Sequence, residues 1–343
     1  LDVDLTEADR FTLAAHYRRD KHDEYQQGFP SGFTEPHQGN LEDTFSIAGE
    51  NRLSLSPAWT LTLGASYDWR DLKKAEEYGA PPAGGPSVLF SYPIRNAAAF
   101  NWQGRLEWHP NEDSELHASV SRRSRFPTIF ERFSTQFGTA ASNPGLEPER
   151  STNFEIGGSR QFGVLRAEGA IFYSNIDDAI VSVRPAGSPA NTTTRRNLGD
   201  AEYYGAELSL TARFGSTLEL GANYTYIHRR FDIMPQVGVT IPAFELTDVP
   251  THKGFAYASW SPTPRLRIVP NVDIASDRTT LTTAAPPVYY RTGSYIQANI
   301  RVDFDILDNV TIGVGAKNLF DDYYVLVDGF PEAGRSFFLS FQY

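Results

Sequence analysis

The sequence predicts an all-β protein, an antiparallel up-and-down transmembrane β-barrel with about fourteen strands in this chain. Three observations predict this fold. Segments of roughly ten residues alternate between apolar and polar positions, the connections between them alternate between long and short, and aromatic residues lie at both ends of the segments. A membrane strand needs one face for lipid and one for a polar lumen, and tilted strands of about 9–11 residues cross the bilayer.

Composition limits the alternatives. No run approaches the roughly 18 apolar residues of a membrane helix, which excludes a helical membrane protein. Hydrophobic residues are 40% of the 343 and the mean hydropathy is −0.39, values that alternating strands produce by averaging two faces. The net charge of −11 argues against nucleic acid as a partner. The sequence has no cysteine and hence no disulfide, and it shows no signal peptide, so an exported protein would be represented by a mature chain or part of one.

The strands can be placed in order. The first is expected over residues 9–19, and the second (44–55) meets the third (59–69) across a tight turn at 56–58. One face of the third strand is apolar and consists of Trp59, Leu61, Leu63, Ala65, Tyr67 and Trp69. The last strand repeats this pattern up to the end of the sequence, with an outward face of Phe337, Leu339, Phe341 and Tyr343. Such alternation is the period of two that a half-exposed strand requires.

Long and short connections alternate strictly. Short turns are expected at residues 56–58, 109–113, 161–163, 215–217, 261–265 and 307–309. Long connections are expected at residues 71–95, 124–150, 184–201, 231–251, 277–294 and 321–334. Bacterial outer-membrane barrels have this asymmetry, with short periplasmic turns and longer external loops.

Aromatic residues supply a second criterion. Trp59 and Trp108 lie beside short turns, whereas Tyr17 and Trp69 lie near long connections. Amphipathic rings gather at both interfaces of a membrane. A soluble β-sandwich also alternates, but it has no reason to place aromatic residues at both ends or all its long loops on one side. The pattern therefore favours the membrane barrel.

Arginine pairs recur where ascending strands reach the long connections. Neighbouring residues of a strand face opposite ways, so one member of each pair is directed outward and the other inward. The outward members are Arg19, Arg122 and Arg230, and the inward members are Arg18, Arg123 and Arg229. We expect the outward three to meet lipopolysaccharide phosphates and the inward three to add positive potential to the lumen mouth. Ordinary solvated charges are the alternative interpretation.

Signs of catalysis are weak, and we expect a protein that is not an enzyme. Charged residues of both signs are predicted to line the lumen and to pair with one another or with a plug. They are Asp68, Arg105, Glu107, Arg166, Glu168, Glu207, Arg213, Glu219, Arg265 and Arg267. The seven histidines lack the helical spacing of metal ligands, so no metal and no cofactor is expected. No Gly-x-Ser-x-Gly motif is present, although a Ser–His pair on adjacent strands leaves an outer-membrane hydrolase as an alternative.

Several motifs resemble those of one family. Residues 124–131 read SRFPTIFE, residues 143–151 read NPGLEPERS, and residues 172–180 read FYSNIDDAI. Residues 197–202 (NLGDAE) precede 205–208 (GAEL), and residues 318–321 (NLFD) precede Gly334 and Arg335. In this order, over about residues 104–343, the motifs resemble the C-terminal barrel portion of TonB-dependent outer-membrane receptors, the siderophore and cobalamin receptor family.

The resemblance implies a 22-stranded barrel filled by an N-terminal plug, importing scarce nutrients with energy from TonB. This sequence contains no plug, no TonB-contacting box, and strands for about fourteen of the twenty-two. We therefore expect residues 1–343 to form one transmembrane β-barrel domain without a plug domain, either part of a larger receptor or a smaller closed barrel. The expected partners are membrane lipid and lipopolysaccharide, a small ligand, and TonB only through a plug absent from this chain.

The resemblance also implies a ligand class, most simply a ferric siderophore. Haem receptors of the family carry a histidine between the two loop motifs, and no histidine lies between Arg125 and Asn143. A cobalamin receptor is the alternative, as is a plugless passive channel in the bacterial outer membrane if the chain is complete. Aromatic and basic residues of the long connections suit an anionic aromatic chelate. The candidates are Tyr78, Phe90, Tyr92, Arg125, Phe133, Phe137, Arg195, Arg196, Tyr289 and Tyr290.

Overall fold

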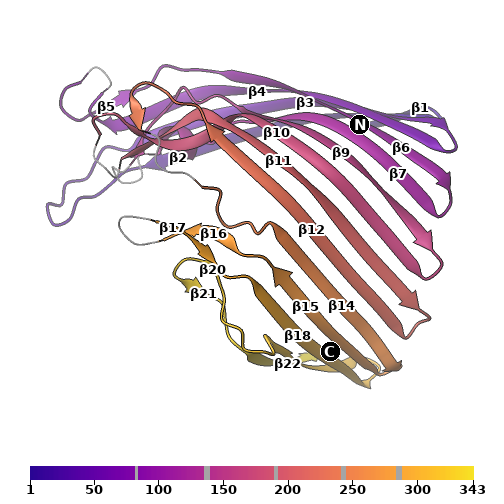
Figure 1. The fold of residues 1–343 in the computed structure, drawn as a ribbon. Coiled ribbons are helices and arrows are strands. Elements are labelled where there is room, and N and C mark those ends of the chain that lie inside the picture. The colour runs from indigo at the N-terminus through magenta and orange to yellow at the C-terminus, as the bar shows by residue number, and fades with distance from the viewer. Residues whose placement is uncertain (82–83, 135–139, 189–191, 241–244, 283–287) are drawn as a thin grey trace.

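A computed structural model describes residues 1–343 except 82–83, 135–139, 189–191, 241–244 and 283–287. Its main feature is one antiparallel sheet of long, tilted strands (Figure 1). In the described ranges there are fourteen such strands, as the sequence predicts. They are β2 (Asp9–Glu24), β3 (Gln38–Ser56), β4 (Trp59–Gly79), β6 (Ala97–Asn111), β7 (Ser114–Arg125), β9 (Glu149–Phe162), β10 (Leu165–Pro185), β11 (Thr193–Phe214), β12 (Leu218–Ile233), β14 (His252–Thr263), β15 (Leu266–Ala275), β18 (Tyr295–Leu307), β19 (Val310–Lys317) and β22 (Ser336–Gln342).

Shorter elements lie at the edge of this sheet and in the long connections. The edge strand is β1 (Asp2–Thr6), which pairs with β2. The connections contain α1 (Ile129–Phe133) and the short strands β5 (Val88–Ser91), β8 (Ala140–Ala141), β13 (Val239–Thr240), β16 (Arg278–Leu281), β17 (Tyr289–Thr292), β20 (Val325–Val327) and β21 (Phe330–Pro331). The long connections are therefore folded segments, several of them hairpins.

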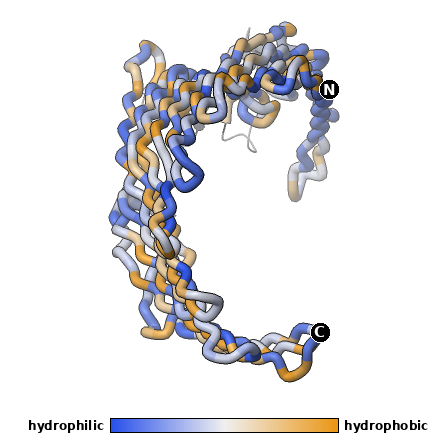
Figure 2. Tube along the Cα trace, turned by 90° about the vertical axis from the view of Figure 1, so that its right-hand side faces the viewer, coloured by the Kyte–Doolittle hydropathy of each residue, from blue (hydrophilic) through white to orange (hydrophobic). Residues whose placement is uncertain are grey.

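Each long strand pairs with its neighbour in sequence, from β2 with β3 through β19 with β22. Tight turns join the strands at one end, and the long connections all lie at the other (Figure 1). Seen along the strands, the sheet is an open arc with the two termini at its two ends (Figure 2). Over the described residues no ladder joins β1 to β22. Of the two arrangements that the sequence left open, the structure is the partial barrel and not a smaller closed one.

Side chains alternate across this sheet as predicted. In β4 the outward Leu63 and Tyr67 are 48% and 51% exposed, whereas the inward Thr62 and Asp68 are half-buried. In β22 the outward Phe337, Leu339 and Phe341 are exposed, and the inward Ser340 donates to the Gly313 carbonyl. A row of exposed apolar side chains on a sheet face is unstable in water and stable in lipid.

Two aromatic rows mark the ends of the apolar band. At the short-turn end Trp59 stacks on Trp108, with ring centroids 5.4 Å apart. At the long-connection end Phe45 lies between Tyr17 and Trp69, with centroids 5.0 Å and 5.3 Å apart. The two predicted belts are thus confirmed at these positions. None of the helices described is long and apolar enough to cross a membrane.

The strands extend further than predicted. β4 runs for 21 residues and β11 for 22, where about ten were expected. The excess lies beyond the aromatic row at the long-connection end, so that much of the connection predicted at residues 71–95 is strand. Outside the apolar band no lipid imposes an apolar face, and the sequence there loses its period of two. β1 and α1 were likewise not predicted, because each is only five residues long.

Candidate functional site

At the long-connection end of the sheet, segments of the connections pack against the strands in three buried clusters. The first joins Leu72 and Ala75 of β4 to Ile129 and Phe133 of α1. The second consists of Val181, Val183 and Leu198 on β10 and β11, against which Val239 of β13 packs. The third consists of Ala275, Tyr295 and Tyr324. Burial of these side chains removes apolar surface from water and so fixes the connections to the sheet. This end of the molecule is therefore a structured rim on which functional side chains can be positioned.

Helix α1 begins with a capping box that the sequence TIFE encodes. The Thr128 side chain accepts from the Glu131 amide, and the Glu131 carboxylate accepts from the Thr128 amide. Two otherwise unpaired amides are thereby satisfied. Arg125 at the end of β7 donates two hydrogen bonds to Glu131, at 2.9 and 3.1 Å, and one to Glu149 at the start of β9. Burial works against ionisation of Glu131, yet the bonds from Arg125 and Thr128 lower its pKa below the ordinary value.

Two asparagines of the sequence motifs connect segments that are far apart in the chain. Asn143 donates to the Arg195 carbonyl at 2.7 Å. Asn197 accepts from the Glu147 amide and donates to the Glu147 carbonyl, both at 2.9 Å. Glu149 also accepts from the amide of Ile180 at 2.6 Å. Three of the motifs, at residues 143–151, 172–180 and 197–202, therefore meet at one place, where they join the β7–β9 connection to β10 and β11.

A buried ionic cluster lies under α1. Glu42 of β3 is 2% exposed and accepts from the fully buried Arg132 at 3.0 Å. The Arg70 guanidinium is 3.5 Å from the same carboxylate oxygen and donates to the Pro127 carbonyl at 2.7 Å. Burial, together with the charge of Arg70, lowers the pKa of Arg132 to about 10. Two guanidiniums thus share one carboxylate, and Nε and Nη2 of Arg132 have no hydrogen-bond partner among the described residues.

The terminal motif has a structural role of its own. Asn318 is completely buried and has a left-handed backbone with φ of 51°. Its side chain accepts from the Asp322 amide at 2.9 Å and donates to the Asp322 and Ala333 carbonyls. Asp321, with φ of 58°, accepts from the Arg335 amide at 2.6 Å. Asparagine and aspartate tolerate this conformation better than other non-glycine residues, which explains the residue types at the turn after β19.

Four of the predicted binding residues, Phe90, Tyr92, Arg125 and Phe133, lie around α1, whereas the ring of Tyr78 lies 6.1 Å from that of Phe33. The ring of Tyr92 is 5.1 Å from that of Phe90 and 6.1 Å from that of Phe133. Tyr92 also donates to Glu77, and burial raises its pKa. Phe133 is 2% exposed and belongs to the first apolar cluster, so its ring is closed to a ligand in this conformation. Tyr78 is half-buried, and Arg125 keeps half of its side chain exposed.

The other candidates divide into two places. The Arg195 guanidinium lies 5.3 Å from the Phe130 ring of α1, which brings it into the same group. Arg196 donates to Gln236 at 3.1 Å. Tyr289 and Tyr290 lie on β17, where Tyr290 donates to Asp328 of the β20–β21 hairpin, among the connections of the C-terminal strands. Phe137 lies outside the described residues.

The outward arginines are on the predicted face but differ in their partners. Arg19 forms two hydrogen bonds with Asp43, at 2.7 and 2.9 Å, and Arg230 pairs with Asp232 at 2.9 Å. Arg122 is exposed and forms no ion pair with any residue that the structure describes. The inward Arg229 donates to the carbonyls of Thr247 and Val249.

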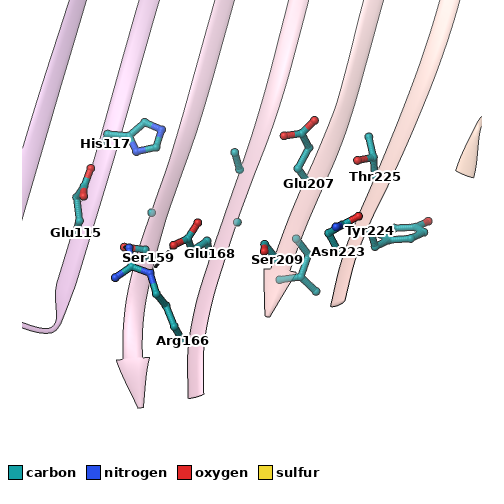
Figure 3. A pocket seen from close by; sticks show the side chains of 14 residues that line it. Glu115, His117, Ser159, Arg166, Glu168, Glu207, Ser209, Asn223, Tyr224 and Thr225 are labelled. Carbon is teal, nitrogen blue, oxygen red and sulfur yellow. Dashed lines mark hydrogen bonds and ion pairs between the residues drawn. The ribbon is translucent and has the colours of Figure 1, made fainter. Parts of the chain in front are cut away.

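The lumen face carries the predicted mixture of charges. A shallow cavity of about 460 Å³ lies across β7 to β12. Figure 3 shows the side chains that line it, among them Glu115, His117, Arg166, Glu168 and Glu207. Arg166 pairs with Glu168, and elsewhere on this face Arg105 pairs with Glu107 and Arg213 with Glu219. The prediction that these charges pair with one another is confirmed for those residues. Within the described ranges no group of three acidic or histidine side chains could hold a metal ion.

Comparisons with known proteins agree on one family. A family model described as "TonB dependent receptor-like, beta-barrel" matches residues 1–319. An iron-regulated outer membrane virulence protein of Vibrio cholerae is 29% identical over 213 residues, 59% of this chain and 32% of that protein. A probable TonB-dependent siderophore receptor, PiuA of Acinetobacter baumannii, is 24% identical over 181 residues, 52% of this chain and 22% of that one.

Solved structures give the same fold. The FrpB iron transporter of Neisseria meningitidis superposes with a TM-score of 0.78 at 18% identity, over 100% of this chain and 53% of the transporter. At this identity the likeness shows the fold alone. The chain thus spans about half the length of that structure and matches about a third or less of the two relatives.

Proposed function

Because this chain belongs to the TonB-dependent receptor family of outer-membrane β-barrels, we propose that it forms part of the wall of a receptor that imports a ferric siderophore. The family match over residues 1–319 carries the proposal, and the relatives named for iron regulation and siderophore reception support the ligand class. The protein is then a transporter and not an enzyme: it binds a ligand and moves it without making or breaking covalent bonds. Energy would reach it from TonB through a plug domain, which the described strands do not include.

We assign ligand capture to the rim at the long-connection end. Around α1, the group of Phe90, Arg125 and Arg195 offers an aromatic face and two cations at places that the motif contacts hold fixed. Tyr78, whose ring lies beside Phe33, adds a second aromatic face on β4. Aromatic rings and guanidiniums bind planar, anionic chelates through stacking and charge-assisted hydrogen bonds. Phe133 and Tyr92 support this group from within the apolar cluster. Arg196, Tyr289 and Tyr290 lie beside other connections and would contact a ligand only there.

Uptake by cells tests the function. A strain that lacks the gene is complemented with the native full-length gene, and uptake of ⁵⁵Fe-labelled siderophores of several classes and of labelled cyanocobalamin is measured with and without TonB. TonB-dependent uptake of an iron chelate is the expected result. Uptake of cobalamin alone would establish the alternative ligand. A stable open pore in planar bilayers, formed by the native protein, would instead indicate a passive channel.

We also propose that Arg122 binds a lipopolysaccharide phosphate. It faces outward beyond the apolar band, and no carboxylate of the described residues pairs with it. Arg19 and Arg230 are weaker candidates, because Asp43 and Asp232 already neutralise them. Arg122→Glu should reduce the lipopolysaccharide retained on purification by a measurable fraction, and the inward Arg123→Glu should not. Equal retention in both variants would discard the proposal.

A further inference from the structure

The outward, lipid-facing side of the sheet has a hollow on strands β7 to β11. Its volume is about 390 Å³, which is within the range of small-ligand sites. The floor of the hollow is formed by Gly158 and Gly169, which pair directly between β9 and β10. Leu116 of β7 pairs with Gly158, and Leu208 of β11 pairs with Gly169. Four neighbouring strands thus place two glycines between two leucines, and we call this hollow the outer trough.

The walls of the outer trough are apolar, and part of its floor is open. Ile156 and Ile171, the next outward residues of β9 and β10, are 60% and 61% exposed. Leu116 leans over Gly158, where an added Cβ would be 2.7 Å from its Cδ2. At Gly169 the nearest side-chain atom, Cδ1 of Leu208, would be 3.9 Å from an added Cβ, so space remains there. Because the hydrocarbon core of a membrane holds no water, a lipid chain is the natural occupant of such a space.

The outer trough begins at the depth of the membrane interface. Trp108, from the aromatic row at the short-turn end, pairs with Leu116. Arg160 lies one outward position closer to the short turn between β9 and β10, and it pairs with Ala167. The small side chain of Ala167 leaves the trough open toward that turn. Short turns of bacterial outer-membrane barrels are periplasmic, so the opening faces the leaflet that consists of phospholipid.

Arg160 is an exposed cation at this opening. Its guanidinium lies 5.0 Å from the centre of the Phe162 ring, which is the next outward side chain toward the turn. Arg160 makes no hydrogen bond or ion pair with any residue for which the structure gives a position, whereas Arg166 on the lumen face is neutralised by Glu168. A long basic side chain beside the hydrocarbon reaches toward the headgroups and costs little at that depth. Arg160 is therefore available to a phosphate.

We propose that the outer trough binds one phospholipid of the periplasmic leaflet, with an acyl chain over Ala167 and Gly169 and the phosphodiester on Arg160. A guanidinium binds phosphate oxygens through paired N–H donors. Among the described outward side chains that line the trough, Arg160 carries the only charge, so the site selects an anionic headgroup. A second copy of the chain is disfavoured there, because it would bring another unpaired Arg160 to the same depth. The inference is independent of the imported ligand.

The test is native mass spectrometry of the delipidated full-length protein in detergent micelles, titrated with palmitoyl-oleoyl phosphatidylglycerol. Arg160→Gln removes the cation. Gly169→Val fills the trough without a clash at Cβ, since an added Cβ there meets no atom closer than 3.4 Å. Arg213→Gln and Ala222→Val are the matched controls. Arg213 lies at the same end of the sheet on the lumen face, and Ala222 faces lipid on β12 outside the trough.

The proposal expects the wild type to bind one phosphatidylglycerol more tightly than any further molecule. Arg160→Gln should weaken this first binding about tenfold or more, as the loss of a charge-assisted hydrogen bond does, and Gly169→Val should weaken it by a similar factor. Arg160→Lys should keep most of the affinity, and both controls should keep all of it.

Three results would overturn the inference. The first is a wild type that binds its first phosphatidylglycerol no more tightly than the next. The second is a loss of affinity in only one of Arg160→Gln and Gly169→Val, because charge or shape alone would then explain the binding. The third is a lipid-free wild-type dimer that Gly169→Val separates, since the trough would then hold a second copy of the chain.

Discussion

Replacing Glu42 by glutamine would test the buried ionic cluster. The substitution keeps the shape of the side chain and an oxygen that Arg132 can still contact, but it removes the negative charge between two guanidiniums. Removing one partner of a buried ion pair typically costs about 3–5 kcal/mol. Because a neutral hydrogen bond remains, we expect the lower end of that range, roughly 3 kcal/mol. At 1.4 kcal/mol for each factor of ten, the equilibrium for opening the α1 segment should rise about a hundredfold.

The assay is amide hydrogen exchange of the native protein, followed at the Arg132 and Ser134 amides, which donate to the Thr128 and Phe130 carbonyls. Glu50→Gln is the matched control, because Glu50 lies on the same face of β3 but is exposed and accepts from the neutral amide of Gln103. Adding Arg132→Met to Glu42→Gln should restore much of the protection, since an apolar side chain of similar length removes a buried charge. If Glu42→Gln exchanges no faster than Glu50→Gln, the cluster does not hold α1 and the reasoning is wrong.

Two further predictions concern the membrane face and the Arg125 contacts. Leu63 lies in the middle of the outward face of β4, and Leu63→Arg should lower the free energy of unfolding, measured by urea titration in lipid vesicles, by about 2–4 kcal/mol. The inward Thr62→Arg is the control and should change this free energy little. Equal effects of the two substitutions would show that the faces are wrongly assigned. The lowered pKa of Glu131 means that its ionised form stabilises α1 above the ordinary carboxyl pKa of about 4.3 and that this support is lost as the pH falls through the lower folded-state value. Pepsin should therefore cleave the native protein within residues 129–133 only in strong acid. Arg125→Gln removes a cause of the lowered pKa, so cleavage of this variant should begin at a higher pH. The same pH threshold in both proteins would contradict the prediction.

The strands and their faces could be predicted because lipid and water impose opposite demands on alternate residues. Leu63 and Tyr67 face lipid and must be apolar, whereas Thr62 and Asp68 face the lumen and need not be. This alternation of apolar and polar residues continues over about ten consecutive positions of the strand. Beyond the aromatic rows both faces meet water or folded connections, and the contrast ends. The upper parts of β4 and β11 were missed for this reason.

The contacts of the rim could not be predicted, because they join residues that are far apart in the chain. Glu42 and Arg132 are 90 positions apart, and Asn143 binds the Arg195 carbonyl 52 positions away. Only α1 left a local signal, the threonine and glutamate of its capping box at positions 128 and 131. The candidate ligand residues were chosen by residue type, and type does not separate a buried ring such as Phe133 from an accessible one such as Phe90.

The length of the strands sets how far the long connections stand from the membrane. At about 3.3 Å per residue and a tilt of about 45°, a strand of 22 residues rises roughly 50 Å, twice the apolar band of about 25 Å. Almost all of the excess lies on the side of the long connections, since Trp59 and Trp108 sit directly beside the tight turns. The long connections therefore stand well clear of the hydrocarbon, and the sheet that carries them stays hydrogen-bonded, past a bulge between Ile176 and Ile180, up to the pairing of Val183 with Thr194.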